Sequence, residues 1–325
     1  MTTRSSALEV SPEAGAAVGQ ASQGVFEFGA PVAAPQEKPI LGVSARSARL
    51  AAVVTPLYRL PLSADEEISL RHLRNYLGHF DRFLIGPEEL LRSAGVAAKH
   101  SDFAIRPFAN KYFTSVQGYS RLMVTENFYR AFSAYDYILM YQLDCLVFSS
   151  DLESWCRGGW DYIGAPLFEG FRNDPAGGLW MVGNGGFSLR KVESALNVLN
   201  SKRLLDDPKV RGPETKRFGS SPELKRMLIA LRTFFLECGF HNTARWMCRE
   251  LEKHPEFYFQ EDLFWAQKGP RLLQGFNIAS LREALSFSFE MAPRYCYQEN
   301  GGRLPFGCHA WAKHDREFWE PFLLK

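Results

Sequence analysis

The sequence predicts an α/β fold in which helices flank a mostly parallel central sheet, and three neighbouring segments carry this prediction. Residues 49–56 are a short apolar run that ends at a proline, which is typical of a buried strand. Residues 64–78 place leucines at helical spacing behind a Ser-x-x-Glu capping box. Residues 83–85 are a second apolar run, closed by Gly-Pro. A strand, a helix and a strand in this order indicate a parallel α/β unit.

The same alternation continues along the chain. Residues 119–134 are predicted to be helical, residues 137–141 to form a central strand, and residues from about 221 to 253 to form a long helical stretch. The strand at 137–141 runs directly into Asp144. Ligands of open α/β sheets bind at the carboxyl ends of strands, so we expect Asp144 to lie in a site.

Residues 1–45 differ in composition from the rest of the chain. They are rich in Ala, Gly, Ser, Gln and Pro, and no apolar period is sustained across them. Such a segment buries too little apolar surface to offset its ordering entropy. We therefore expect a flexible tail over 1–45 and one folded domain over 46–325.

The composition of the 325 residues excludes several classes of protein. Hydrophobic residues make up 46%, enough for a sizeable core, and a net charge of +2 leaves no basic surplus for nucleic acid. The six cysteines form no Cys-x-x-Cys pair, which argues against a zinc ribbon. No apolar run approaches the roughly 20 residues that span a bilayer, and no signal-peptide pattern precedes the body. We expect a cytoplasmic protein without a transmembrane segment, with peripheral membrane association left open.

Two clusters, at 144 and at 184–186, could bind a phosphate-containing ligand, and each has a simpler structural explanation. Asp144, at the end of an apolar strand, either binds a cation or caps the next turn, and the residue alone favours neither. Asn184, Gly185 and Gly186 either expose backbone N–H groups to phosphate oxygens or form an ordinary tight turn.

Two further clusters lie in the C-terminal part. Glu261 and Asp262 could supply a general base, with Trp265 as a stacking face for a sugar, or could simply begin a helix. His309 could bind a metal, although a lone histidine is more often a hydrogen-bonded structural residue. Trp311 follows it and could contact an acceptor.

Taken in order, these clusters resemble the core of GT-A type glycosyltransferases. A more distant likeness is to the glycogenin-like retaining transferases, and a closer one is to a family of bacterial and fungal proteins classed as a domain of unknown function and regarded as glycosyltransferases. The resemblance runs from about residue 48 to 322 and rests on six segments in fixed order: Val54–Tyr58, Gln117–Met123, Trp160–Pro166, Gly183–Arg190, Glu261–Trp265 and Pro305–His309.

The resemblance implies a GT-A fold and a site for a UDP-, GDP- or dTDP-sugar, with a glycan, lipid-linked or protein acceptor. Asp144 and His309 match the positions that hold a divalent cation, Mn²⁺ or Mg²⁺, on the donor's diphosphate. A catalytic or sugar-binding acid is implied at Glu261 or Asp262. The other implied donor residues are Thr55, Pro56, Tyr58, Arg121, Gln142, Asn184, Gly185 and Gly186.

One residue departs from the family pattern. Gln142 stands where the first acid of the Asp-x-Asp motif is expected, and an amide adds no charge to attract a cation. Strict metal dependence is therefore open, with Arg121 or Lys111 as further partners for phosphate. Gln142 also motivates an alternative, a non-catalytic sugar-binding or nucleotide-binding module on the same fold. Nucleotidyl transfer is a third reading, but no Gly-rich basic triphosphate loop is evident.

Overall fold

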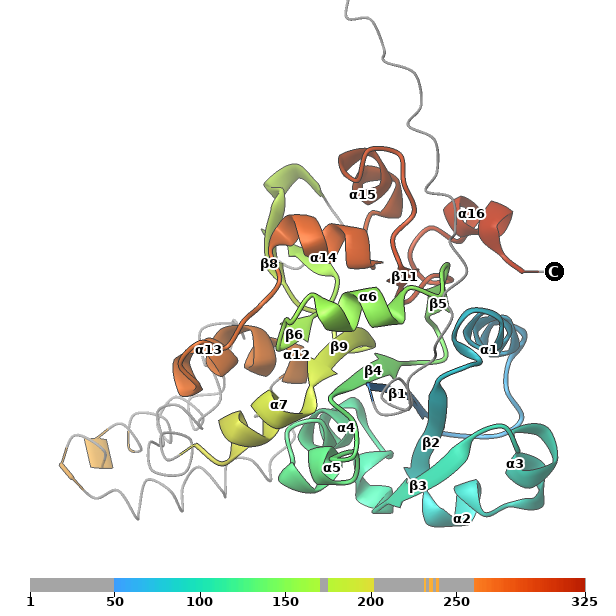
Figure 1. Ribbon diagram of the computed structural model, residues 1–325, viewed down its shortest axis with the longest axis horizontal. Helices are drawn as coiled ribbons and strands as arrows, with labels where there is room; N and C mark the ends of the chain where they lie inside the picture. The colour runs from blue at the N-terminus through green and yellow to red at the C-terminus, as the bar shows by residue number, and fades with distance from the viewer. Residues whose placement is uncertain are drawn as a thin grey trace, which may run out of the picture. The chain divides into compact units, whose positions relative to one another are not determined.

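The computed structural model describes residues 50–169, 175–201 and 260–324, with five isolated positions between 231 and 239 (Figure 1). The tail predicted over 1–45 lies outside the described residues. So does nearly all of the helical stretch predicted over 221–253.

The central sheet has six strands in the order β3-β2-β1-β4-β9-β6. Neighbours among the first four are parallel, whereas β9 is antiparallel to both β4 and β6. The bounds are β1 Ala51–Pro56, β2 Asp81–Pro87, β3 Ala104–Phe108, β4 Tyr137–Tyr141, β6 Tyr162–Ile163 and β9 Phe187–Lys191. This confirms the predicted fold class, an α/β architecture with a mostly parallel central sheet flanked by helices.

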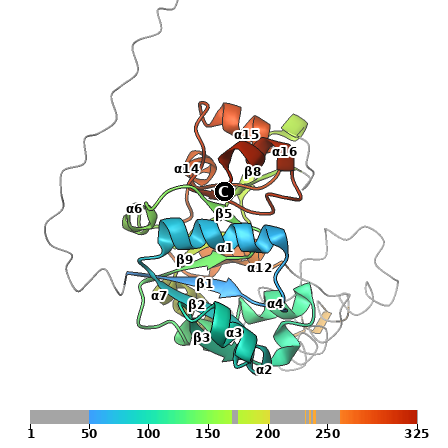
Figure 2. The same ribbon diagram turned by 90° about the vertical axis from the view of Figure 1, so that its right-hand side faces the viewer.

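Alternate residues of the central strands point to two separate apolar layers. On one face, Val53 and Leu139 pack with α1 (Ala64–Leu77) and α6 (Leu152–Arg157). On the other face, Val54 and Met140 pack with helices α4 (Val116–Leu122), α5 (Glu126–Arg130) and α7 (Val192–Leu199). Figure 2 shows α1 and α7 on opposite sides of the strands. Strands buried on both faces explain the continuous apolar runs in the sequence.

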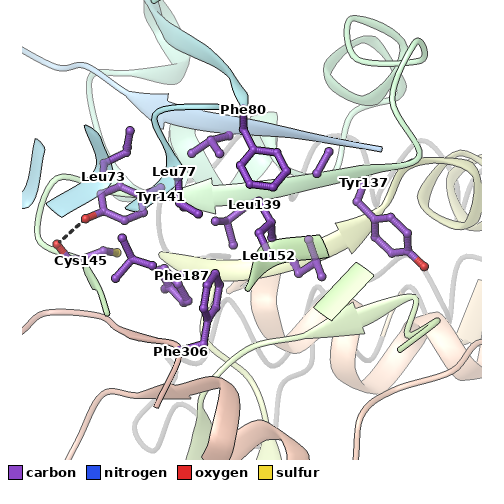
Figure 3. Packing of buried hydrophobic residues seen from close by; sticks show 14 of the residues in the cluster. Leu73, Leu77, Phe80, Tyr137, Leu139, Tyr141, Cys145, Leu152, Phe187 and Phe306 are labelled. Carbon is purple, nitrogen blue, oxygen red and sulfur yellow. Dashed lines mark hydrogen bonds between the residues drawn. The ribbon is translucent and has the colours of Figure 1, made fainter. Parts of the chain in front are cut away.

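Tyr141, the last residue of β4, closes the layer beneath α1 and carries the chain into the site. Its ring packs beside Phe187 (Figure 3). Its buried hydroxyl donates to the carbonyl oxygens of Ser69 at 2.9 Å and Cys145 at 3.1 Å. These bonds tie helix α1 to the turn that contains Asp144.

Two smaller sheets complete the described part of the chain. One has the order β10-β11-β5 (Ser288–Phe289, Gly307–Cys308, Leu146–Val147), and the other pairs β7 (Pro166–Phe168) with β8 (Leu179–Val182). The remaining helices are α2 Glu88–Leu91, α3 Ala94–Lys99, α12 Glu261–Leu263, α13 Gly269–Leu272, α14 Leu281–Phe287, α15 Pro293–Glu299 and α16 Arg316–Trp319. Of the described helices, none is long and apolar enough to cross a membrane.

The helix predicted over 119–134 is wrong in its continuity, since α4 and α5 are separate short helices. The break follows Met123, whose carbonyl oxygen accepts from the side chains of Tyr129 at 3.0 Å and Trp265 at 3.2 Å. Thr125 then caps α5 by accepting from the Phe128 N–H at 3.3 Å. The side chains therefore supply hydrogen bonds that a continuous helix would have made within its backbone.

The capping box predicted for α1 is present, with the Ser63 hydroxyl accepting from the Glu66 N–H and the Glu66 carboxylate accepting from the Ser63 N–H. Ser63→Ala removes one of these bonds. We expect the free energy of unfolding to fall by about 1 kcal/mol in urea denaturation. Ser133→Ala, at an exposed serine outside the helices, is the matched control and should change it by less than about 0.5 kcal/mol. Equal effects of both changes would contradict the role of the cap.

Candidate active site

The three short strands β10, β11 and β5 bring distant parts of the sequence to one edge of their small sheet. Strand β11 is parallel to β10 and antiparallel to β5, with Cys308 paired to both Phe289 and Leu146. Residues that follow β10 and β11 therefore lie at the same edge as residues that precede β5. By this arrangement Glu290, His309 and Asp144 meet, and the latter two are the residues predicted to hold a cation.

His309 is at the centre of this group. Its Nε2 lies 3.3 Å from Asp144 Oδ1 and 3.3 Å from Gln142 Oε1, and its Nδ1 lies 3.0 Å from Glu290 Oε1. Burial lowers the pKa of His309, but the two neighbouring carboxylates outweigh it and raise that pKa to about 10. For Asp144, burial raises the pKa, but the interaction with His309 more than offsets this effect, so the pKa of Asp144 is lowered. Half of the Asp144 side chain (51%) is exposed, so the group is open to solvent on that side.

The donor atoms around His309 Nε2 fit a divalent cation of the Mg²⁺ or Mn²⁺ type. They comprise a carboxylate, an amide oxygen and an imidazole nitrogen, which would release its proton on binding a cation, and the exposed side of Asp144 faces solvent. Cys145 is also near enough to be grouped with Asp144 and His309. However, its buried thiol donates to the Gly186 carbonyl oxygen at 3.3 Å, and burial raises its pKa well above the usual range. A thiol that stays protonated is a poor ligand.

Asn184 holds the glycine-rich loop in shape. It lies in the left-handed region at φ 68°, and its Oδ1 accepts from the backbone N–H groups of Gly186 at 2.9 Å and Phe187 at 3.1 Å. A Cβ at Gly186 would overlap the His309 ring, and a Cβ at Gly185 would overlap Glu261. The loop therefore contacts His309 on one side and Glu261 on the other, and both glycines are required by side chains that approach them closely.

Glu261 is held in a buried ion pair that the sequence interpretation missed. Arg190, with 1% of its side chain exposed, donates to Glu261 Oε1 at 2.9 Å, to the Tyr129 hydroxyl at 3.2 Å and to the Gly185 carbonyl oxygen at 3.3 Å. A signal was available, because Ser188 and Arg190 alternate with apolar residues in β9, so an arginine faces the interior and needs a carboxylate. The Glu261 carboxylate is therefore paired with the Arg190 guanidinium.

Asp262 has a different environment from its neighbour. Its Oδ2 accepts from the Asn184 N–H at 3.1 Å and its Oδ1 from the Leu263 N–H at 2.8 Å. Burial and the adjacent Glu261 carboxylate raise the pKa of Asp262 to about 6, against these hydrogen bonds. A carboxyl group with a pKa near neutrality is suited to acid–base work.

The residues predicted to contact the nucleotide lie at the carboxyl end of β1 and on α4. Thr55 and Pro56 are buried, and the Thr55 hydroxyl has no hydrogen-bond partner among the described residues. Tyr58 is 47% exposed and makes an edge contact with Tyr119 at 6.1 Å between ring centroids. Tyr119 in turn contacts Gln142, which links this end of β1 to the turn before Asp144. Arg121 lies on α4 and is partly buried.

The two tryptophans predicted to contact an acceptor are core residues. Trp265 is 1% exposed and donates from Nε1 to Met123, and Trp311 is fully buried in the layer that covers β10 and β11. Sugars stack on an open ring face, and neither ring offers one. Their aromatic character reflects packing, so the acceptor role predicted for them is corrected here.

Comparison with known proteins gives a family. A family model described as "Protein of unknown function (DUF5672)" matches residues 102–309. The chain belongs to this family. No curated protein matches the sequence.

Several solved glycosyltransferase structures are similar to this chain. The galactosyltransferase LgtC in complex with donor and acceptor sugar analogues is 14% identical over 79% of this chain and 86% of its own, with a TM-score of 0.39. A glycosyltransferase involved in the glycosylation of the major capsid of PBCV-1 is 11% identical over 82% and 96%, with a TM-score of 0.37. Mouse xyloside xylosyltransferase 1 in its apo form is 11% identical over 80% and 97%, with a TM-score of 0.40. Identities of this size transfer neither a substrate nor a residue's role, which are inferred below from the site itself.

Arg190→Met leaves the Glu261 carboxylate buried without its cation. We expect the free energy of unfolding to fall by about 3–5 kcal/mol in urea denaturation, whereas the double change Arg190→Met/Glu261→Met should recover most of that loss. Arg157→Met, which breaks an exposed ion pair with Glu153, is the control and should cost less than about 1 kcal/mol. A loss in the double variant as large as in Arg190→Met alone would show that the ion pair is not the cause.

Proposed function

We propose that this protein is a nucleotide-sugar-dependent glycosyltransferase of the GT-A type, which moves a sugar from a UDP-, GDP- or dTDP-sugar to a hydroxyl of a glycan, lipid-linked or protein acceptor. The observation that carries the proposal is the meeting of Asp144 and His309 at the carboxyl end of β4, with donor atoms 3.3 Å apart and solvent on one side. The strand order β3-β2-β1-β4 supports the proposal, because it reverses between β1 and β4, and α/β sheets bind ligands at the carboxyl ends of strands beside such a reversal.

One set of residues is proposed to bind the nucleotide-sugar donor. A divalent cation held by Asp144 and His309 would neutralise the charge that develops on the departing nucleoside diphosphate. Gln142 can hydrogen-bond a ribose hydroxyl from the same turn, and Thr55 and Tyr58 lie at the neighbouring end of β1, where the base would be bound. Arg121 is the proposed further partner of the diphosphate.

Asp262 is the proposed general base. Deprotonated Asp262 would accept the proton of the acceptor hydroxyl as that oxygen attacks the anomeric carbon, and the carbon–oxygen bond to the diphosphate breaks. Direct attack of this kind inverts the anomeric configuration. Glu261 is proposed to hold the loop through Arg190 instead, because its carboxylate is paired.

A second function, a binding module without turnover, is favoured by one observation, the amide at Gln142. Slow hydrolysis of the donor sugar distinguishes the two functions. Hydrolysis that is present in the wild type, lost in Asp144→Ala and Asp262→Ala, and kept in Asp151→Ala, at an exposed aspartate, would establish catalysis. Donor binding without hydrolysis or transfer in any condition would establish the module.

Donor binding with Mn²⁺ should stabilise the folded state. In a thermal-shift screen of nucleotide sugars, a ligand at 100 times its dissociation constant adds about 2.7 kcal/mol to the free energy of unfolding. We expect a rise in melting temperature with one class of nucleotide sugar in Mn²⁺, a smaller rise with a chelator, and loss of the Mn²⁺ increment in Asp144→Ala. If no nucleotide sugar shifts the wild-type protein with or without Mn²⁺, the proposed function is excluded.

Activity should follow the ionisation of Asp262. Its pKa is raised to about 6, so the base form is lost as the pH falls through that value, and kcat/KM should drop about tenfold per pH unit below it. Asp262→Asn should lose on the order of 10²–10⁴ in kcat at every pH, and its kcat/KM should not show this fall at acidic pH. Circular dichroism verifies that the variant is folded. If kcat/KM of Asp262→Asn still falls at acidic pH, the titration belongs to another group.

A further inference from the structure

Glu290 lies in the candidate site although no sequence motif pointed to it. It directly follows β10, just as His309 directly follows β11, and these strands are paired in parallel register. The Glu290 carboxylate lies 3.0 Å from His309 Nδ1, on the opposite side of the ring from Asp144. Only 18% of the Glu290 side chain is exposed, so this contact is largely shielded from water.

Asn184 settles which atom of His309 carries the proton at this contact. Its Oδ1 is fixed by the N–H groups of Gly186 and Phe187, so its amide NH₂ must point the other way, towards Glu290 and His309. An NH₂ group and an Nδ1–H are both donors, and the shared acceptor between them is the Glu290 carboxylate. His309 Nδ1 therefore donates to Glu290, and the Nε2 atom is the one that faces Asp144 and Gln142.

We propose that Glu290 is a positioning residue, which fixes His309 with Nδ1–H towards its own carboxylate and Nε2 towards a divalent cation that Asp144 also binds. This inference rests on the proposed function. A carboxylate behind a metal-binding histidine sets its tautomer and its ring orientation, and makes the nitrogen a more basic ligand. The chain lacks an acid at Gln142, and Glu290 would supply negative charge to the same cation through the imidazole.

The test is the Mn²⁺ affinity of the full chain, measured from the EPR signal of free Mn²⁺ without nucleotide and with UDP, GDP or dTDP. Glu290→Gln keeps the shape of the side chain and removes its charge, and should weaken Mn²⁺ binding by about 10–100-fold. His309→Ala should weaken it at least as much, and should remove the nitrogen coupling to Mn²⁺ that pulsed EPR detects in the wild type. Glu290→Asp should recover part of the affinity. Glu283→Gln, at the capping glutamate of α14, is the matched control and should bind Mn²⁺ as the wild type does.

The possible outcomes separate this inference from the proposed function. If Glu290→Gln binds Mn²⁺ as tightly as the wild type, while His309→Ala does not, Glu290 has no positioning role and the cation site stands. If Glu290→Gln is weakened only as much as it is destabilised in urea without Mn²⁺, and Glu290→Asp recovers nothing, Glu290 is merely structural. If the wild type binds no Mn²⁺ alone or with UDP, GDP or dTDP, both the Glu290 role and the cation of the proposed function are overturned.

Discussion

Backbone pairing between β5 and β11 sets the distance between Asp144 and His309, and the candidate site depends on that distance. Gln142 and His309 are 167 positions apart in the sequence, yet their side chains come within 3.3 Å. A bond from the Trp311 N–H to the Asp144 carbonyl oxygen at 3.2 Å continues this pairing, and a bond from the His309 N–H to the Phe289 carbonyl oxygen at 2.9 Å continues the pairing of β11 with β10. Asp144 and His309 are thus both attached to hydrogen-bonded backbone, which limits how far their side chains can move.

The surroundings of two adjacent acids give them different chemistry. Glu261 faces the Arg190 guanidinium inside the protein, where a charge without a partner would be costly. Within the described part of the chain, no cation is paired with Asp262, and the neighbouring Glu261 carboxylate disfavours its ionisation. One acid therefore stabilises the loop at Gly185, and the other retains a proton until near neutral pH. Different surroundings are how neighbouring carboxylates acquire distinct roles.

The sequence predicted the elements whose signals are local and the contacts that parallel strands impose. The helix at 64–77, with its capping box, and the strand at 137–141 follow from periodicity and turn residues. The break after Met123 could not be predicted, because the groups that satisfy its carbonyl come from Tyr129 and from the distant Trp265. Burial of aromatic rings is likewise a tertiary property, so the sequence alone predicted Trp265 as a stacking face for a sugar, whereas the structure buries it in the core.

Glu290 shows why the candidate site was incompletely predicted. It lies between Phe289 and Met291 in no motif, and its importance arises only from the register of β10 against β11. Asp144 and Glu290 place a carboxylate beside each ring nitrogen of His309, so the three side chains together keep a net negative charge whether or not His309 is protonated. That charge would attract a cation even though Gln142 is neutral, because the field at the open side of Asp144 depends on the whole group. Under the proposal, the acid absent from the turn after β4 is offset by an acid placed behind the histidine.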